Sequence, residues 1–210
     1  MCIRDRVGAD GSVTTVAAFD GPVMTPVQIA GRETSMRLPF GTTPTWATDG
    51  DNVYLARGDS AEVFTYAGGE SRAAVWESRP GGVTPSDSER GAAVYREVAG
   101  EDTLFLPKWE TFELPQAMPV VNGVLAGADG SVWVRRYPRA AGGLPHLYAL
   151  RSGDEPDRWW VLDGGGGVRG EVVVPSGFTV LAVFDDGRVA GVMRDPLGVE
   201  RIYVYELMGG

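Results

Sequence analysis

The chain has 210 residues, a formal net charge of −9 and an apolar share of 43%. This composition is typical of a globular protein with a hydrophobic core and excludes a disordered or transmembrane chain. The acidity disfavours nucleic acid as a partner, because an acidic surface repels phosphate groups. A single cysteine, Cys2, and a single histidine, His146, exclude a disulfide framework and any zinc site built from thiolates or imidazoles.

The first six residues, Met1–Arg6, lack the apolar stretch of a signal peptide. They resemble the translated adapter leader that begins some metagenomic gene predictions. We therefore expect residues 1–6 to be a non-native leader and the true start to be missing. No apolar run reaches the ~18 residues of a membrane-spanning helix, so we expect no membrane span in this chain.

An acidic turn followed by an apolar strand recurs along the sequence. The string Gly8–Val13 is repeated at Gly127–Val132, and further Asp-Gly pairs begin at Asp49 and Asp186. The four repeated aspartates, at 10, 49, 129 and 186, are 39, 80 and 57 residues apart. These intervals indicate a unit of about 40 residues into which extra segments have been inserted.

Short strands rich in β-branched and aromatic residues lie between these turns, and Asp-Gly is a strong signal for a β-hairpin. We predict four units of four antiparallel strands, over 7–40 (with a damaged first strand), 42–77, 119–175 and 177–210. Four-stranded units of about 40 residues are typical of β-propeller blades. The predicted fold class is thus an all-β propeller whose last unit lacks its outermost strand.

Two insertions, 78–118 and 138–157, interrupt the repeat. In the first, Thr84, Pro85 and Asp87 form the capping signature of a helix start. Apolar and small residues then share one face of a short helix that ends near Gly100: Gly91, Val94, Tyr95 and Val98. A stray strand is expected at 104–106. The second insertion is rich in proline and glycine and predicts a long hairpin loop.

Two stretches carry a family resemblance: Gly123–Val134, which includes Asp-Gly-Ser-Val-Trp-Val, and Arg194–Tyr205, which begins Arg-Asp-Pro-Leu-Gly-Val-Glu. Through them, residues 115–207 resemble a bacterial six-bladed β-propeller family of the NHL- or TolB-like kind. The resemblance implies that about four of six blades are present, so that 7–210 is one incomplete domain from the C-terminal part of a longer protein. It also implies a periplasmic or extracellular location, although this chain contains no signal segment.

Three motifs that can signal enzyme chemistry have simpler explanations. Gly165-x-Gly167-x-x-Gly170 fits the dinucleotide-binding pattern, but a strand follows it where that motif requires a helix, so we predict a turn. Ser60 is a nucleophile candidate only if His146, far along the chain, acts as its base. The many aspartates are explained by turn chemistry, and we expect neither a metal ion nor a cofactor.

One candidate binding site remains, formed by Arg57, Arg135, Arg194 and Trp133. Strand alternation places Trp133 and Arg135 on one face, and the other two arginines lie near equivalent strand ends. If they converge on the mouth of the propeller channel, they suit an anionic ligand or a peptide carboxylate. The alternative is that Trp133 packs in the core and that the arginines are surface residues whose stems cover apolar neighbours.

These observations favour a non-enzymatic binding or scaffold module that presents its rim loops and channel mouth to a protein, peptide or glycan. One alternative is a hydrolase or lyase with a metal at the channel mouth, which requires three or more Asp, Glu, Asn or His side chains to converge there. The other alternative is a truncated gene fragment without independent function. Fold-level analogy alone does not decide among them.

Overall fold

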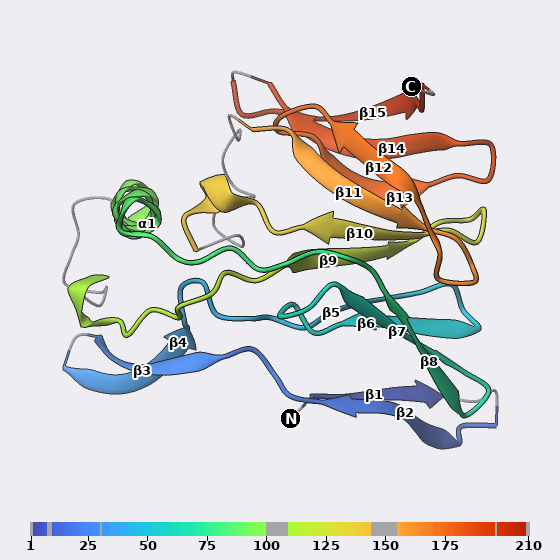
Figure 1. Ribbon diagram of the computed structural model, residues 1–210, viewed down its shortest axis with the longest axis horizontal. Helices are drawn as coiled ribbons and strands as arrows, with labels where there is room; N and C mark the ends of the chain where they lie inside the picture. The colour runs from blue at the N-terminus through green and yellow to red at the C-terminus, as the bar shows by residue number, and fades with distance from the viewer. Residues whose placement is uncertain are drawn as a thin grey trace.

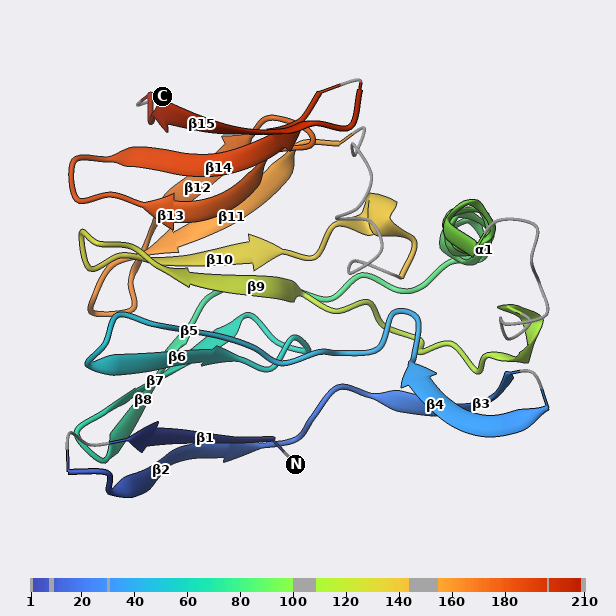
Figure 2. The same cartoon turned by 180° about the vertical axis from the view of Figure 1, so that it is seen from behind.

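The computed structural model describes residues 2–7, 10–29, 31–99, 109–143, 155–195 and 197–208. These residues form five antiparallel β-sheets and one α-helix (Figure 1). The larger sheets follow one another along the molecule in chain order, and the N-terminal hairpin lies at the opposite end from the C-terminal sheet (Figures 1 and 2). This arrangement confirms the predicted all-β, propeller-like fold.

The second and third predicted units each form one four-stranded sheet, as expected. The second comprises β5 (Thr45–Thr48), β6 (Asn52–Ala56), β7 (Glu62–Ala67) and β8 (Glu70–Val75). The third comprises β9 (Val121–Ala126), β10 (Val132–Arg136), β11 (Asp157–Leu162) and β12 (Val168–Val174). In each sheet the strands are paired in sequence order, so every connection within it joins adjacent antiparallel strands. The glycine motif Gly165–Gly170 spans the β11–β12 turn and the start of β12, which confirms that it is not the opening of a helix.

The fourth unit has three strands, also as predicted. They are β13 (Thr179–Val183), β14 (Arg188–Arg194) and β15 (Glu200–Glu206). Their order in the sheet is β13–β14–β15, so β15 lies at an edge.

The first unit differs from the expectation of a single four-stranded blade. Its strands are β1 (Cys2–Val7), β2 (Val13–Phe19), β3 (Met24–Ile29) and β4 (Arg32–Arg37), and they form two separate hairpins, β1–β2 and β3–β4. Pro26 lies within β3, opposite Ser35 of β4. Because proline has no backbone N–H to donate, it favours an edge strand and disfavours the interior position that β3 would take in a four-stranded blade.

Two apolar layers between the larger sheets make up the core. The first lies between β5–β8 and β9–β12 and includes Val63, Val134 and Leu162, each at most 1% exposed. The second lies between β9–β12 and β13–β15 and includes Trp133 and Phe178. The β9–β12 sheet therefore buries both of its faces, because successive residues of a strand point in opposite directions.

The four repeated aspartates have the same structural role. The backbone N–H two residues further along donates to the carboxylate Oδ1 of each aspartate, over 3.0–3.1 Å: Ser12 to Asp10, Asp51 to Asp49, Ser131 to Asp129 and Arg188 to Asp186. The glycine that follows each aspartate has a positive φ, between 77° and 101°. Turn chemistry therefore accounts for these aspartates, as the sequence predicts.

The first insertion contains the expected helix, α1 (Pro85–Ala99). Thr84 caps it: the Thr84 hydroxyl accepts from the backbone N–H of Asp87, and the Asp87 carboxylate accepts from the backbone N–H of Thr84. This reciprocal pair confirms the predicted capping box. Gly91 and the side chains of Val94 and Tyr95 are buried, as predicted. The side chain of Val98, Gly100 and the expected strand at 104–106 lie outside the described residues. No helix in the described part of the chain is long and apolar enough to cross a membrane.

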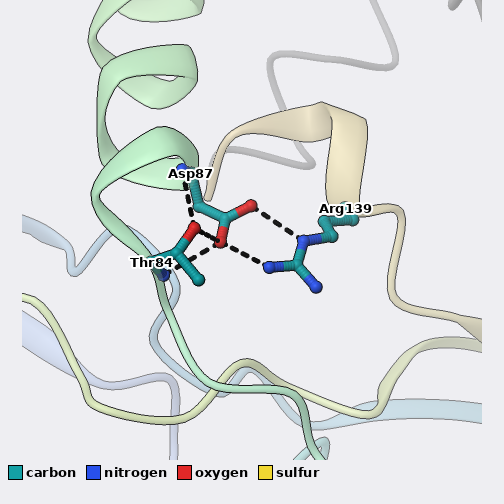
Figure 3. A network of polar contacts seen from close by, with 3 residues as sticks. All are labelled: Thr84, Asp87 and Arg139. Carbon is teal, nitrogen blue, oxygen red and sulfur yellow. Dashed lines mark hydrogen bonds and ion pairs between the residues drawn. The ribbon is translucent and has the colours of Figure 1, made fainter.

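The capping box also joins the two insertions. The Asp87 carboxylate, 3% exposed, accepts two hydrogen bonds from the Arg139 guanidinium, at 2.8 Å from Nε and 2.6 Å from Nη2 (Figure 3). Arg139 begins the short 3-10 helix η3 (Arg139–Ala141) in the second insertion. These bonds hold the pKa of Asp87 far below its usual range, so the carboxylate is ionised at any neutral or mildly acidic pH. We call the Thr84–Asp87–Arg139 network the clasp.

Acidification is expected to destabilise the protein through its turn aspartates. Backbone N–H groups donate to Asp163, Asp186 and Asp195, and they lower the pKa of each below the ordinary value of 3.8. A lowered pKa in the folded state contributes stability that is complete above the unfolded-state pKa and is lost as the pH falls through the folded-state value. Urea denaturation should therefore give similar unfolding free energies at pH 7 and 5 and steadily smaller ones below pH ~4. A free energy that stays constant to pH ~2 would contradict this role.

Gly91→Ala is expected to destabilise the contact between the two insertions. A Cβ atom at Gly91 would collide with the Gly142 carbonyl oxygen and with the ring of Trp109, which belongs to the 3-10 helix η2 (Trp109–Thr111). Replacing glycine by alanine within a helix ordinarily raises the free energy of unfolding by about 1 kcal/mol. Here we expect the opposite effect, a decrease of about 1–3 kcal/mol, because the methyl group has no room. Thermal unfolding monitored by circular dichroism measures it. Ala93→Gly, at an exposed position of the same helix, is the control and should lose only the helix propensity.

Candidate functional site

A cavity of about 540 Å³ lies between the end of β2 and the β5–β8 sheet. Its volume lies within the range of ~300–1,000 Å³ that is usual for ligand pockets. Apolar residues and three charged side chains line it: Ala18, Phe19, Asp20, Gly21, Val23, Thr42, Pro44, Leu55, Arg57, Asp59, Phe64 and Tyr66. We call this cavity the β2 groove.

Strand register explains why the β5–β8 sheet contributes an apolar floor to the groove. Leu55 of β6 lies directly opposite Phe64 of β7, and Tyr66 follows two residues later on the same face. The rings of Phe64 and Tyr66 have centroids 6.5 Å apart. The opposite face of these strands presents Tyr54 and Val63, which pack in the first core layer. The sheet therefore uses one face for the core and the other for the groove.

A glycine, Gly58, fixes the position of the charged residues at one end of the groove. Gly58 follows β6 with a φ of +95°, and its carbonyl oxygen accepts from the backbone N–H of Val120, at 2.7 Å, and of Val121. A Cβ atom at this position would approach the Thr43 carbonyl oxygen to 3.2 Å. Because Gly58 is fixed between two chain segments, it positions its neighbours Arg57 and Asp59 at the rim of the groove.

The ion pair between Arg57 and Asp59 is open and loose. Arg57 Nη2 and Asp59 Oδ2 are 3.4 Å apart, and the two side chains are 57% and 49% exposed. Exposed pairs of this kind contribute about 0–1 kcal/mol, so a ligand can displace either partner at little cost. Asp20 adds a second carboxylate to the lining. The charged side chains of the groove thus sum to one net negative charge at neutral pH, beside three aromatic rings.

The predicted site residues lie in or beside three different sheets, and each has its own neighbours. Arg57 lines the β2 groove, whereas Trp133 is 1% exposed in the second core layer, with its ring centroid 6.2 Å from that of Trp159. Arg135 pairs with Asp157 of the adjacent strand, at 2.7 Å, and Arg194 pairs with Glu200 of β15, also at 2.7 Å. Each of the three arginines therefore has a carboxylate partner in its own sheet or in a turn of that sheet.

The enzyme candidates gain no further support from the described residues. The Ser60 hydroxyl donates to Asp59 at 3.2 Å, and His146 lies outside the described residues. Within the described part of the chain, no three His, Cys, Asp or Glu side chains form a group that could hold a metal ion.

The sequence identified only Arg57 among the residues of the β2 groove. Phe64 and Tyr66 stand out as an aromatic strand, but their spacing does not reveal that this face meets β2 rather than another sheet. Phe19 and Asp20 were missed because the first unit was expected to form a closed four-stranded blade. Burial gives no local signal either, because Leu55 is as deeply buried as its neighbours Tyr54 and Ala56.

Comparisons with known proteins give no family for this chain. No protein-family model and no curated protein sequence matches it. Among solved structures, it is similar to a Bacteroides fragilis protein named as a 6-phosphogluconolactonase, at a TM-score of 0.28 and 10% identity over 98% of this chain and 64% of the other. It is also similar to the glutaminyl cyclase of Myxococcus xanthus, at a TM-score of 0.22 and a sequence identity of 14%. This match covers 84% of this chain and 79% of the other. The chain thus spans less than two thirds of the first of these structures, and likeness at this level carries no argument about activity.

Arg135 and Arg57 are expected to differ sharply in their effect on stability. Arg135→Met would leave Asp157, whose side chain is only 15% exposed, without its cation, and should lower the unfolding free energy by about 1–3 kcal/mol. Arg57→Met, which removes an exposed pair, should change it by less than about 0.5 kcal/mol. Urea denaturation of both variants measures the difference. Equal effects would show that the pairing of Arg135 is not structural.

Proposed function

We propose that this protein is a binding module whose β2 groove takes a basic peptide segment of a protein partner. The observation that carries the proposal is the groove itself, in which aromatic side chains lie beside two carboxylates and a loosely held arginine. Aromatic faces attract cations, and they also bury the apolar stems of lysine and arginine side chains. The net charge of −9 for the whole chain favours the approach of a basic partner.

This proposal retains the predicted class of function and changes the expected ligand charge. An anion would compete with Asp59 for Arg57 and would meet Asp20 in the same groove. A basic side chain instead pairs with either carboxylate, and Arg57 remains available for a backbone carbonyl oxygen of the peptide. We also retain, as part of the proposal, the NHL- or TolB-like resemblance, which the stretches 123–134 and 194–205 support.

The test uses fluorescence anisotropy with a synthetic peptide in which lysine and leucine alternate, against the same peptide with glutamate in place of lysine. The wild-type chain should bind only the basic peptide. Asp59→Asn should weaken this binding by about two- to fivefold, the contribution of one exposed charge pair. Tyr66→Ser should weaken it by about threefold or more through the loss of an aromatic face.

Asp51→Asn is the matched control, because it removes one negative charge from an exposed turn of the same sheet outside the groove. Its affinity for the basic peptide should equal that of the wild type. If Asp51→Asn and Asp59→Asn weaken binding equally, attraction comes from net charge alone and the groove is not the site. If the wild-type chain binds the lysine peptide and the glutamate peptide equally well, the proposal is contradicted directly.

A further inference from the structure

Phe40, in the connection between β4 and β5, has a strained backbone. Among the residues that the structure describes, it is the one non-glycine residue with a positive φ, of 58°. The residue is 1% exposed, so its ring is buried. In this left-handed region the Cβ atom of an L-residue comes too close to the following carbonyl oxygen. Such a conformation persists only where the surrounding contacts impose it.

The second insertion supplies contacts of this kind. The backbone N–H of Phe40 donates to the Gly143 carbonyl oxygen at 3.1 Å. The ring lies so close to Gly143 that a Cβ atom there would be 2.8 Å from two of the ring carbons. Gly142 packs equally closely on α1, because a Cβ atom at Gly142 would be 2.7 Å from the Cα atom of Gly91. The segment that holds Phe40 is therefore itself fixed to the helix of the first insertion.

Backbone hydrogen bonds connect Phe40 to one wall of the β2 groove. The Gly41 N–H donates to the Leu38 carbonyl oxygen at 2.9 Å and closes a turn around Phe40. Val23 joins both ends of this turn, because its carbonyl oxygen accepts from the Leu38 N–H at 2.9 Å and its own N–H donates to the Thr42 carbonyl oxygen at 3.1 Å. Val23 and Thr42 both line the groove. Because φ and ψ are the only soft rotations of the backbone, a change of φ at Phe40 redirects the chain at Thr42 and moves this wall.

We infer that Phe40 is a conformational switch through which the second insertion regulates the β2 groove. While the insertion is docked on α1, Phe40 stays in the left-handed region, and Val23 and Thr42 keep the groove in its present shape. When the insertion detaches, φ at Phe40 relaxes to a negative value and the wall moves. Docking of the insertion and filling of the groove therefore favour each other, since coupling between two sites is reciprocal. The chemistry of the ligand rests on the proposed function, whereas the switch does not.

Urea denaturation tests the strain without any ligand. Phe40→Gly and Phe40→Ala remove the same ring and differ in the cost of a left-handed backbone. The equilibrium constant for unfolding should therefore be about five- to thirtyfold larger for the alanine variant. Gly142→Ala, whose methyl group collides with α1, detaches the insertion and should abolish this difference. If Gly142→Ala does not fold, Gly91→Ala separates the same two segments from the side of the helix.

Gly187→Ala is the matched control for Gly142→Ala. It also places alanine at a positive φ, of 81°, but in the β13–β14 turn, where a Cβ atom meets nothing within 4 Å. The difference between the two Phe40 variants should persist in this chain. Equal unfolding constants for the two Phe40 variants, or the same difference in the Gly142→Ala and Gly187→Ala chains, would overturn the inference.

Movement of the groove wall is measured with a single thiol. The chain has one cysteine, so Thr42→Cys in a Cys2→Ser chain presents only the new thiol to an aromatic disulfide reagent. Because Thr42 is half-buried, Gly142→Ala should raise the rate of modification by about threefold or more. Gly187→Ala should leave the rate as it is. An unchanged or lower rate in the Gly142→Ala chain would overturn the regulation of the groove.

Peptide binding then separates this inference from the proposed function. In fluorescence anisotropy, Gly142→Ala should bind the lysine–leucine peptide about fivefold or more weakly than Gly187→Ala does. Equal affinities of these two variants would overturn the coupling. A wild-type chain that binds no basic peptide contradicts the proposed function instead, and the urea and thiol measurements then decide the switch by themselves.

Discussion

The architecture depends on one constraint, which is that a β-sheet has two faces and both need cover when both are apolar. The β9–β12 sheet meets it fully, because Val134 and Leu162 pack toward one neighbouring sheet while Trp133 and Trp159 pack toward the other. This central sheet requires a neighbour on each side. It therefore orders the β5–β8 and β13–β15 sheets in the succession that the chain itself follows.

Each of those two neighbouring sheets has one face that is not fully buried, and the two faces differ in their side chains. The β5–β8 sheet meets β2 across a groove, and the face there mixes Phe64 and Tyr66 with the rim charges of Arg57 and Asp59. The β13–β15 sheet instead exposes Ile202 and Val204 of β15 on the face that points away from the second core layer. A concave surface that mixes aromatic and charged side chains is typical of a ligand-binding site.

The features that the sequence predicted correctly are those with short-range causes. Each repeated turn is stabilised by a hydrogen bond from a backbone N–H to the aspartate two residues earlier. A stretch of four or five residues is therefore sufficient to predict the turns at Asp10, Asp49, Asp129 and Asp186. The start of α1 depends on four residues, Thr84 to Asp87.

The features that the sequence missed depend on contacts between distant segments. Nothing near Arg135 in the sequence indicates that Asp157, 22 residues later, pairs with its guanidinium. The division of the first unit into two hairpins does have a local cause in Pro26, but a single proline competes with the strong periodic signal of the neighbouring units. The groove then follows from where β2 comes to lie, which no local pattern specifies.

The clasp has a consequence for how the protein opens. Asp87 belongs to one insertion and Arg139 to the other, and the residues after Arg139 reach a third segment, where the backbone N–H of Phe40 donates to the Gly143 carbonyl oxygen at 3.1 Å. Three stretches that together span about a hundred residues of the chain are thus linked, and we expect them to open together. Amide protons in the first turns of α1 should exchange with solvent at the rate at which η3 detaches, not at the rate at which the helix frays.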